Sequence, residues 1–278
     1  MDMSPTIEEK PPPAAYAIRA RNISVNAENA IHNDEGARSL GFAGGLVSGV
    51  TVYAYLTRPL VARFGTEALE GTTQRTAFFA PVYEGDALRI ESTTAPESLA
   101  HAVRVQAAKA DGEAVALLEV ERPALLPEPA ALPAFQPRGP EEERPRFAWD
   151  AVAPGRAFRG FLWRPAAEEQ RAWCESVQDD LPLYREGARP PCHPGWVLQQ
   201  ANQAISREFR MTPWIHVSSR IVWRGLPRVG EAIEVRAEPR ETWEKDGNRF
   251  VLLHVALAAA GRPLLEIAHK AILQVASR

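Results

Sequence analysis

Apolar and polar positions in the first half of the chain predict one long helix followed by several strands. Residues 49–64, GVTVYAYLTRPLVARF, carry apolar side chains at roughly helical spacing and only two charges, which predicts a mostly buried helix. Pro59 lies inside this segment and is a residue that can kink a helix. Alternating runs bounded by turn residues then predict strands at residues 74–82, 86–94, 101–110 and 113–122.

The second half repeats this order. Residues 195–209, GWVLQQANQAISREF, predict a second helix, and strands are expected at residues 216–225, 231–239, 249–259 and 262–275. Gly49 and Gly195 lie 146 positions apart, and two later pairs of matching glycines lie 145 and 149 positions apart. A repeat of this length indicates a duplicated domain. Because strand follows strand without crossover helices, each half is expected to be α+β, one long helix wrapped by a mainly antiparallel sheet.

A proline-rich stretch separates the two halves. Residues 127–146, PEPAALPAFQPRGPEEERPR, contain six prolines and three consecutive glutamates, a composition that does not continue a helix or a central strand. The sequence thus predicts a first domain at 16–126, a connector at 127–146 and a second domain at 147–278. Residues 1–15 hold prolines and charges without a secretion-signal pattern, and we expect them to form a disordered arm.

Composition narrows the classes of protein and partner. With 45% hydrophobic and 24% charged residues the chain is typical of a globular protein, and its apolar runs end before membrane-spanning length. A formal net charge of -3 gives no electrostatic reason to expect nucleic acid or an anionic membrane as partner. Cys174 and Cys192 form neither a disulfide framework nor a zinc spacing, which favours a reducing, cytoplasmic setting. The composition leaves homo-oligomer formation open.

Candidate chemistry lies between Ser24 and Val50, where SVNAENAIHNDEGARSLGFAGGLVSGV combines one histidine with a glycine-rich stretch. This segment resembles the motif of the MaoC-like acyl thioester hydratase and dehydratase family, roughly G-D-x-N-P-I-H followed by G-F and an aliphatic-aliphatic-x-G turn. The matching residues are Asn29, Ile31, His32, Ala37, Gly41, Phe42, Leu46 and Gly49. The resemblance implies a hotdog fold in each half, and therefore a double hotdog.

This sequence departs from the motif at a position where the family has a catalytic residue. Alignment on His32 places Ala27 where the family has its catalytic aspartate and Ala30 where it has proline. In such enzymes the aspartate and histidine resemble a pair that holds one water, while hydrogen-bond donors stabilise the charge on the thioester oxygen. The resemblance implies that Ser48 and Gly49, at the start of the predicted helix, supply those donors. It also implies a substrate contact for Asn29.

The second half carries a complementary remnant of the motif. Asp179 lies 152 positions after Ala27, and Tyr184 lies 152 positions after His32. We therefore expect one of two arrangements: Asp179 supplies the acid to the His32 site, or it belongs to a degenerate second site with Tyr184. A site that combines His32 and Asp179 is physically allowed, because the two halves of a fused pair can contribute to one site. Asp179 is equally consistent with a turn cap before Pro182.

Other polar residues divide between site and structural roles. His193 precedes the second predicted helix, where it contacts substrate or only completes a turn. His216 is expected to be a hydrogen-bonded core histidine, and Glu28 and Asp34 to be solvated charges that can rotate in to replace the missing acid. The six histidines include no i, i+4 pair and no grouping with cysteine, so no metal site is predicted.

These features together favour hydration or dehydration of a 2-enoyl or 3-hydroxyacyl thioester carried on coenzyme A or an acyl carrier protein. His32 and Asp179 are the predicted catalytic residues, and no cofactor is expected. The predicted substrate-binding residues are Asn29, Ser48, Gly49, Tyr184 and His193. One alternative is a hotdog protein that binds an acyl thioester, or serves as a partner subunit, without hydrating; Ala27 is its main support. The other is a related isomerase or cyclase that needs only one proton-transfer group.

Overall fold

A computed structural model describes residues 15–92, 98–139 and 142–276. The predicted arm at 1–15 therefore lies outside the described residues except for its last position. The first half begins with a short edge strand and a loop, followed by a long helix and four strands. Its elements are β1 (Tyr16–Arg19), α1 (Asp34–Ser39), α2 (Gly49–Phe64), β2 (Thr72–Phe78), β3 (Ala87–Ser92), β4 (Val103–Lys109) and β5 (Ala114–Glu121).

The second half follows the same plan. Its elements are β6 (Phe161–Trp163), α3 (Ala167–Ser176), α4 (Pro194–Glu208), β7 (Ile215–Trp223), β8 (Ile233–Lys245), β9 (Asn248–Ala259) and β10 (Arg262–Gln274). Short 3-10 helices lie at Ala30–His32, Gly65–Ala68, Trp149–Ala151 and Pro182–Tyr184. The two long helices and the eight strands after them fall where the hydrophobic pattern predicts them. The edge strands β1 and β6 and the helices α1 and α3 are additional, because each is too short or too polar to give a periodic signal.

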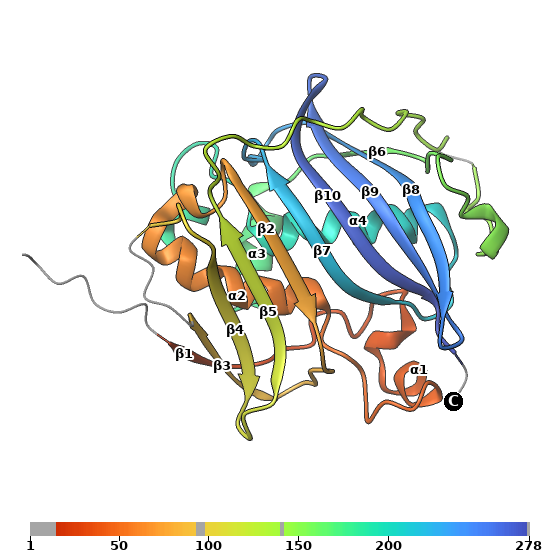
Figure 1. Cartoon of the computed structure of the whole chain (residues 1–278), viewed down its shortest axis with the longest axis horizontal. Coiled ribbons are helices and arrows are strands. Elements are labelled where there is room, and N and C mark those ends of the chain that lie inside the picture. Colours follow the sequence, from red (N-terminus) through yellow and green to blue (C-terminus); the bar gives the residue numbers. More distant parts are fainter. Residues whose placement is uncertain (1–14, 93–97, 140–141, 277–278) are drawn as a thin grey trace, which may run out of the picture.

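All ten strands form one antiparallel sheet in the order β1-β3-β4-β5-β2-β7-β10-β9-β8-β6. The second half of this order repeats the first in reverse, as a two-fold relation between the halves requires. The halves join edge to edge where β2 pairs with β7, and Arg75 lies directly opposite Arg220, its counterpart in the second half. Figure 1 shows the two sets of strands side by side in this continuous sheet. Their joining leaves neither half with an open β2 or β7 edge.

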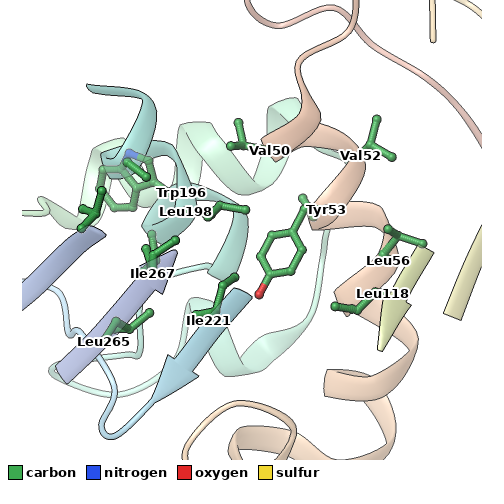
Figure 2. Packing of buried hydrophobic residues seen from close by; sticks show 14 of the residues in the cluster. Val50, Val52, Tyr53, Leu56, Leu118, Trp196, Leu198, Ile221, Leu265 and Ile267 are labelled. Atoms are coloured by element: carbon green, nitrogen blue, oxygen red, sulfur yellow. The ribbon is translucent and has the colours of Figure 1, made fainter. Parts of the chain in front are cut away.

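The long helices lie together on one face of the sheet (Figure 1). Helix α2 packs on β3, β4 and β5, α4 packs on β8, and the two helices contact each other. Their apolar side chains form one core with the inward residues of both sets of strands. Figure 2 shows Tyr53 extending from α2 toward Ile221 on β7, so this core crosses the junction between the halves. The structure is thus the predicted α+β arrangement, duplicated.

The segment between the halves runs along the second half, over the face of the sheet that does not carry the long helices. The backbone of Ala130 donates to Glu266 over 2.7 Å, and Arg236 donates to the carbonyl of Pro133 over 3.1 Å. The connector therefore covers sheet surface, although residues 140–141 lie outside the described part. The division at 127–146 stays a prediction. Among the described residues, the helices are all too short or too polar to span a bilayer.

Gly195 permits the close contact between α2 and α4. A Cβ at this position would lie 2.8 Å from the Ala54 side chain and 2.9 Å from the Val50 carbonyl oxygen. The backbone carbonyl cannot move aside without shifting α2. We predict that Gly195→Ala lowers the free energy of unfolding by about 1–3 kcal/mol, the usual cost of overpacking.

Gly139→Ala is the matched control for this test, because the only described atom within 4.0 Å of a Cβ there is Cβ of Glu142. Chemical denaturation of both variants measures the difference. Equal unfolding free energies for the two variants would contradict the close helix contact.

Candidate active site

The loop that carries His32 is tied to both halves of the molecule. Asn29 begins the 3-10 helix Ala30–His32, and its side chain accepts a hydrogen bond from the backbone of Ile31. The same amide group donates to the carbonyl of Trp214 over 2.9 Å and accepts from the Trp214 backbone N–H over 3.2 Å. Asn29 therefore fixes the His32 loop to the second half. The substrate contact predicted for Asn29 stays a prediction.

His32 is held in one tautomer. Its Nδ1 lies 2.8 Å from the Leu46 carbonyl oxygen, which can only accept, so Nδ1 carries the proton. Nε2 has no hydrogen-bond partner among the described residues and offers a free lone pair. Burial lowers the pKa of the ring below its usual value of 6.5, against an opposing contribution from the Leu46 bond. His32 is therefore a neutral, oriented base at neutral pH.

A mostly apolar cavity of about 260 Å³ opens beside His32. Both halves contribute to it, with Phe78 and Val82 from the first and Trp214 and Ile272 from the second. Apolar clefts with a few convergent polar groups are typical ligand sites. The other lining residues are Asn29, Ile31, His32, Phe42, Leu46, Val47, Ser48, Gly49, Val52, Phe79, Ala80, Pro81, Val115, Asn202, Ile215, His216 and Val217.

The start of α2 forms part of the cavity wall. The Ser48 hydroxyl bonds to Thr51 Oγ1 over 2.9 Å and does not cap the helix. The backbone N–H groups of Gly49 and Val50 have no acceptor among the residues that the structure describes, as expected for the first turn of a helix. Glycine at position 49 lets the Phe78 ring lie close to the helix start, because a Cβ there would be 2.8 Å from the ring. These donors and the positive end of the helix dipole can stabilise an oxyanion.

A second, more polar hollow adjoins the cavity. The two share His32 and Asn202, and Ala27, Arg144 and Arg207 line the polar hollow. Ala27 therefore faces a space next to His32 but offers it no carboxylate.

The two acids close to His32 in sequence are each paired with other residues. Glu28 pairs with Arg144 over 2.7 Å, and Asp34 accepts from the Gly45 backbone over 3.0 Å and pairs with Arg38. Both carboxylates thus have partners of their own in the loop and its surroundings.

The structure does not bring Asp179 to His32. Asp179 is buried and lines neither hollow; its Oδ2 lies 3.2 Å from His193 Nε2, and its Oδ1 accepts from Leu181 N over 3.1 Å. Arg58, nine residues along α2 from Gly49, lies 3.6 Å from its carboxylate. The prediction of a water shared with His32 is corrected accordingly, because each half places its motif loop at its own helix. Asp179 is a turn cap and ion-pair partner.

His193 and Tyr184 complete this closed cluster. The His193 ring accepts at Nδ1 from the Trp173 indole over 3.2 Å and from the Gly195 backbone over 3.1 Å, so Nε2 carries the proton toward Asp179. The Tyr184 ring packs 4.6 Å from His193, and both side chains are fully buried. Both were predicted to bind substrate, but neither lines a hollow. The second half has filled the space that the first keeps open.

Two polar residues of the second half line the cavity although the sequence did not single them out for it. Asn202 projects from α4 and leaves its Oδ1 without a partner among the described residues. His216, predicted to be a core histidine, is hydrogen-bonded at Nε2 but also lines the cavity. The local sequence pattern could not predict that either residue lines the cavity, because both come from the second half whereas His32 lies in the first.

The geometry agrees with comparisons against solved structures. Neither a protein-family model nor a curated protein matches the sequence. A MaoC domain protein dehydratase, described as putative, from Chloroflexus aurantiacus superposes with a TM-score of 0.65 at 12% identity, covering 94% of this chain and 93% of that one. A conserved hypothetical protein from Mycobacterium tuberculosis with a double hotdog fold gives 0.64 at 12% identity, covering 94% of each chain.

This protein has the double hotdog fold. The fold is shared by MaoC-like dehydratases, as the resemblance around His32 implies. A third structure, described as a putative oleoyl thioesterase from Lactobacillus plantarum, superposes with a TM-score of 0.54 at 10% identity over 94% of this double hotdog chain and 95% of its own. Proteins with this fold are thus described with more than one activity, and the reaction has to be argued from the site.

The closed cluster predicts a structural effect for Asp179→Asn. Asparagine cannot accept both from His193 Nε2–H and from Leu181 N–H without turning its own N–H₂ group toward a donor. We expect the free energy of unfolding to fall by about 1–3 kcal/mol. The turnover number of folded protein should remain within about two-fold, because Asp179 lies outside the cavity.

Asp180→Asn provides the control, since Asp180 is exposed and also pairs with Arg58. It should lower the free energy of unfolding much less than Asp179→Asn does, because water screens an exposed ion pair. A hundred-fold loss of turnover in folded Asp179→Asn protein, on the scale expected for a lost catalytic group, would restore the shared-acid arrangement.

Proposed function

We propose that this double hotdog protein catalyses hydration and dehydration of a 2-enoyl or 3-hydroxyacyl thioester, with His32 as its single proton-transfer group. The observation that carries the proposal is the free Nε2 of His32 at the wall of an apolar cavity, near the unpaired N–H groups at the start of α2. A base and a set of oxyanion donors are the two elements that proton transfer next to a thioester carbonyl needs.

One imidazole can move the proton in both steps. In dehydration, His32 Nε2 removes a proton from Cα, and the electron pair of that bond moves toward the thioester carbonyl to form an enolate. The imidazolium then returns the proton to the β-hydroxyl group, the Cβ–O bond breaks and water leaves as the double bond forms. Hydration is the reverse sequence. Because the same ring removes and returns the proton on one face, the reaction does not need a carboxylate at position 27.

The two hollows suggest how the thioester lies. The apolar cavity suits the acyl chain, and the adjoining polar hollow, with Arg144 and Arg207, suits the amides and phosphates of the carrier arm. His32 belongs to both hollows, so a substrate that spans them would carry its thioester group beside Nε2. The substrate partner on this proposal is an acyl group on coenzyme A or on an acyl carrier protein.

The second candidate is a protein that binds acyl thioesters without hydrating them. Ala27 favours it, because a two-group mechanism is not available in the His32 site. The single base would also serve an isomerase that shifts a double bond by moving one proton. These candidates share the ligand and differ in the product, so one assay separates them.

We predict that His32→Asn abolishes hydration. The asparagine amide can still donate to the Leu46 carbonyl in place of Nδ1, but it offers no base in place of Nε2. Purified protein is assayed with crotonyl and longer enoyl thioesters by the loss of conjugated absorbance. The turnover number should fall by about 10² to 10⁴-fold, the usual contribution of a general base.

His101→Asn is the control for this assay, because His101 is exposed and lies outside both hollows. Hydration by His32→Asn at the wild-type rate would reject the proposal. A wild type that is inactive on every enoyl thioester and gains hydration only with Ala27→Asp would favour the non-hydrating candidate.

The pH dependence follows from the lowered pKa of His32. Burial favours the neutral ring, so the basic form persists to a lower pH than for a free histidine. In the hydration direction kcat/KM should rise with pH through a midpoint below 6.5 and stay level above it. Initial rates from about pH 5 to pH 8 measure this limb. A midpoint above 7 would show that another group controls the rate.

A further inference from the structure

Three buried polar residues form a hydrogen-bonded chain that ends at the cavity. His216 Nε2 lies 2.9 Å from Ser219 Oγ, and Ser219 Oγ lies 3.0 Å from His269 Nδ1. The two outer nitrogens, His216 Nδ1 and His269 Nε2, have no hydrogen-bond partner among the described residues. His216 is only 8% exposed, and its ring lines the cavity wall. The chain thus presents one unpaired imidazole nitrogen where the substrate is expected to lie.

A β-bulge turns His216 toward the site. In the pairing of β7 with β10, Ser218 lies opposite Lys270 and His216 opposite Ala271, so Val217 is an extra residue in β7. Strict alternation from the inward-facing Ser219 would point residue 216 to the other face of the sheet. The bulge reverses this and aligns His216 with Ser219. Bulges that redirect a side chain are frequent next to active sites.

The hydrogen-bonded chain allows two arrangements of its protons, and an oxygen bound in the cavity favours one of them. The Ser219 hydroxyl donates once, so with both rings neutral it accepts from one imidazole and donates to the other. If it donates to His269, the proton of His269 lies on the buried, unpaired Nε2. If it donates to His216, the proton of His216 lies on Nδ1, at the cavity. Each arrangement leaves one buried N–H without a partner among the described residues. An oxygen bound in the cavity can pair the N–H on His216 Nδ1 but not the one on His269 Nε2, because only His216 lines the cavity, so a bound thioester favours the proton on His216 Nδ1.

His216 Nδ1 adjoins the start of α2. It would lie 3.1 Å from a Cβ placed on Gly49, and the His216 ring packs edge-on against Phe78 with ring centroids 4.9 Å apart. The unpaired N–H groups of Gly49 and Val50 are part of the same helix start. An oxygen bound by these backbone donors would also be close to His216.

We propose that His216 is a catalytic residue that donates a hydrogen bond from Nδ1 to the thioester carbonyl oxygen and so stabilises the enolate as a neutral electrophile. This inference rests on the proposed function of the His32 site and adds the side-chain donor of that reaction. Burial and the neighbouring His269 ring hold the pKa of His216 well below 6.5, against a smaller opposing contribution from the Ser218 backbone. A neutral imidazole that polarises a carbonyl is an established device where the ring is kept from protonating.

Two substitutions of similar size test the donor. Asparagine at position 216 places an amide N–H₂ group where Nδ1 lies, while leucine offers no donor; both lose the bond to Ser219. We expect His216→Leu to lower the turnover number for crotonyl thioester by about 10²-fold with a smaller change in KM, and His216→Asn to stay within about 10-fold of wild type. Thermal unfolding of both variants checks their folding.

If His216 only supports the fold, the leucine and asparagine variants should lose turnover to the same extent, because both lose the bond to Ser219. Equal turnover numbers for the folded leucine and asparagine variants would therefore overturn the proposal. Comparison with His32→Asn distinguishes a failure of the donor role of His216 from a failure of the proposed hydration. If it is inactive while His216→Leu retains wild-type turnover, the donor role fails and the proposed hydration stands.

The tautomer can be measured without any turnover. In the wild-type protein with bound butyryl-CoA at neutral pH, ¹⁵N chemical shifts should show His216 protonated at Nδ1 and bare at Nε2, with the resonance assigned by its loss in His216→Asn. Butyryl-CoA, which has the thioester but no double bond to hydrate, should shift the Nδ1 proton resonance. A proton on Nε2, or no response to butyryl-CoA, would overturn the proposal even if the leucine variant fails to fold.

Discussion

The pairing of β2 with β7 is the contact on which the rest of the structure depends. It joins two five-stranded sheets into one and brings α2 and α4 together on the same face. The cavity lies at this junction, because Phe78 at the end of β2 and His216 near the start of β7 both line it. The first half folded alone would lack the wall of the cavity that the second half supplies, including His216.

The duplication has produced two unlike sites on similar scaffolds. Each half places a motif loop before the start of its long helix. In the first half the helix start keeps free N–H groups and opens to a cavity. In the second half the side chain of His193 accepts from the first turn of α4, and Trp173 and Tyr184 pack against its ring. Burial of an imidazole is tolerated there because all its polar atoms are paired.

The absence of a carboxylate at position 27 is consistent with the way His32 is held. A carboxylate next to a histidine commonly orients the ring and stabilises its charged form. Here the Leu46 carbonyl orients the ring over 2.8 Å, and burial keeps it neutral. On the proposed mechanism the lost group is not replaced by another acid. The neutral donors at the start of α2, joined by His216, carry the charge that develops on the substrate.

Much of this protein is determined locally along its sequence. The two long helices and the eight strands after them follow from apolar periodicity, and the duplication follows from the spacing of glycines. The residues around His32 are what single it out as a candidate. Whether His32 and Asp179 hold one water together could not be tested this way. A matching offset in sequence shows which positions are equivalent, but it does not show which are adjacent. The fold shows that equivalent loops lie at different helices.

The tertiary structure alone decided which side chains complete the site. His216 reaches the cavity only because Val217 bulges out of the β7 ladder, and a bulge changes the facing of a residue without changing the hydrophobic pattern around it. Asn202 reaches the same cavity because α4 packs against α2 across the junction. Local sequence sets the period of each element, whereas the residues that meet are set by register and packing between elements that lie far apart in the chain.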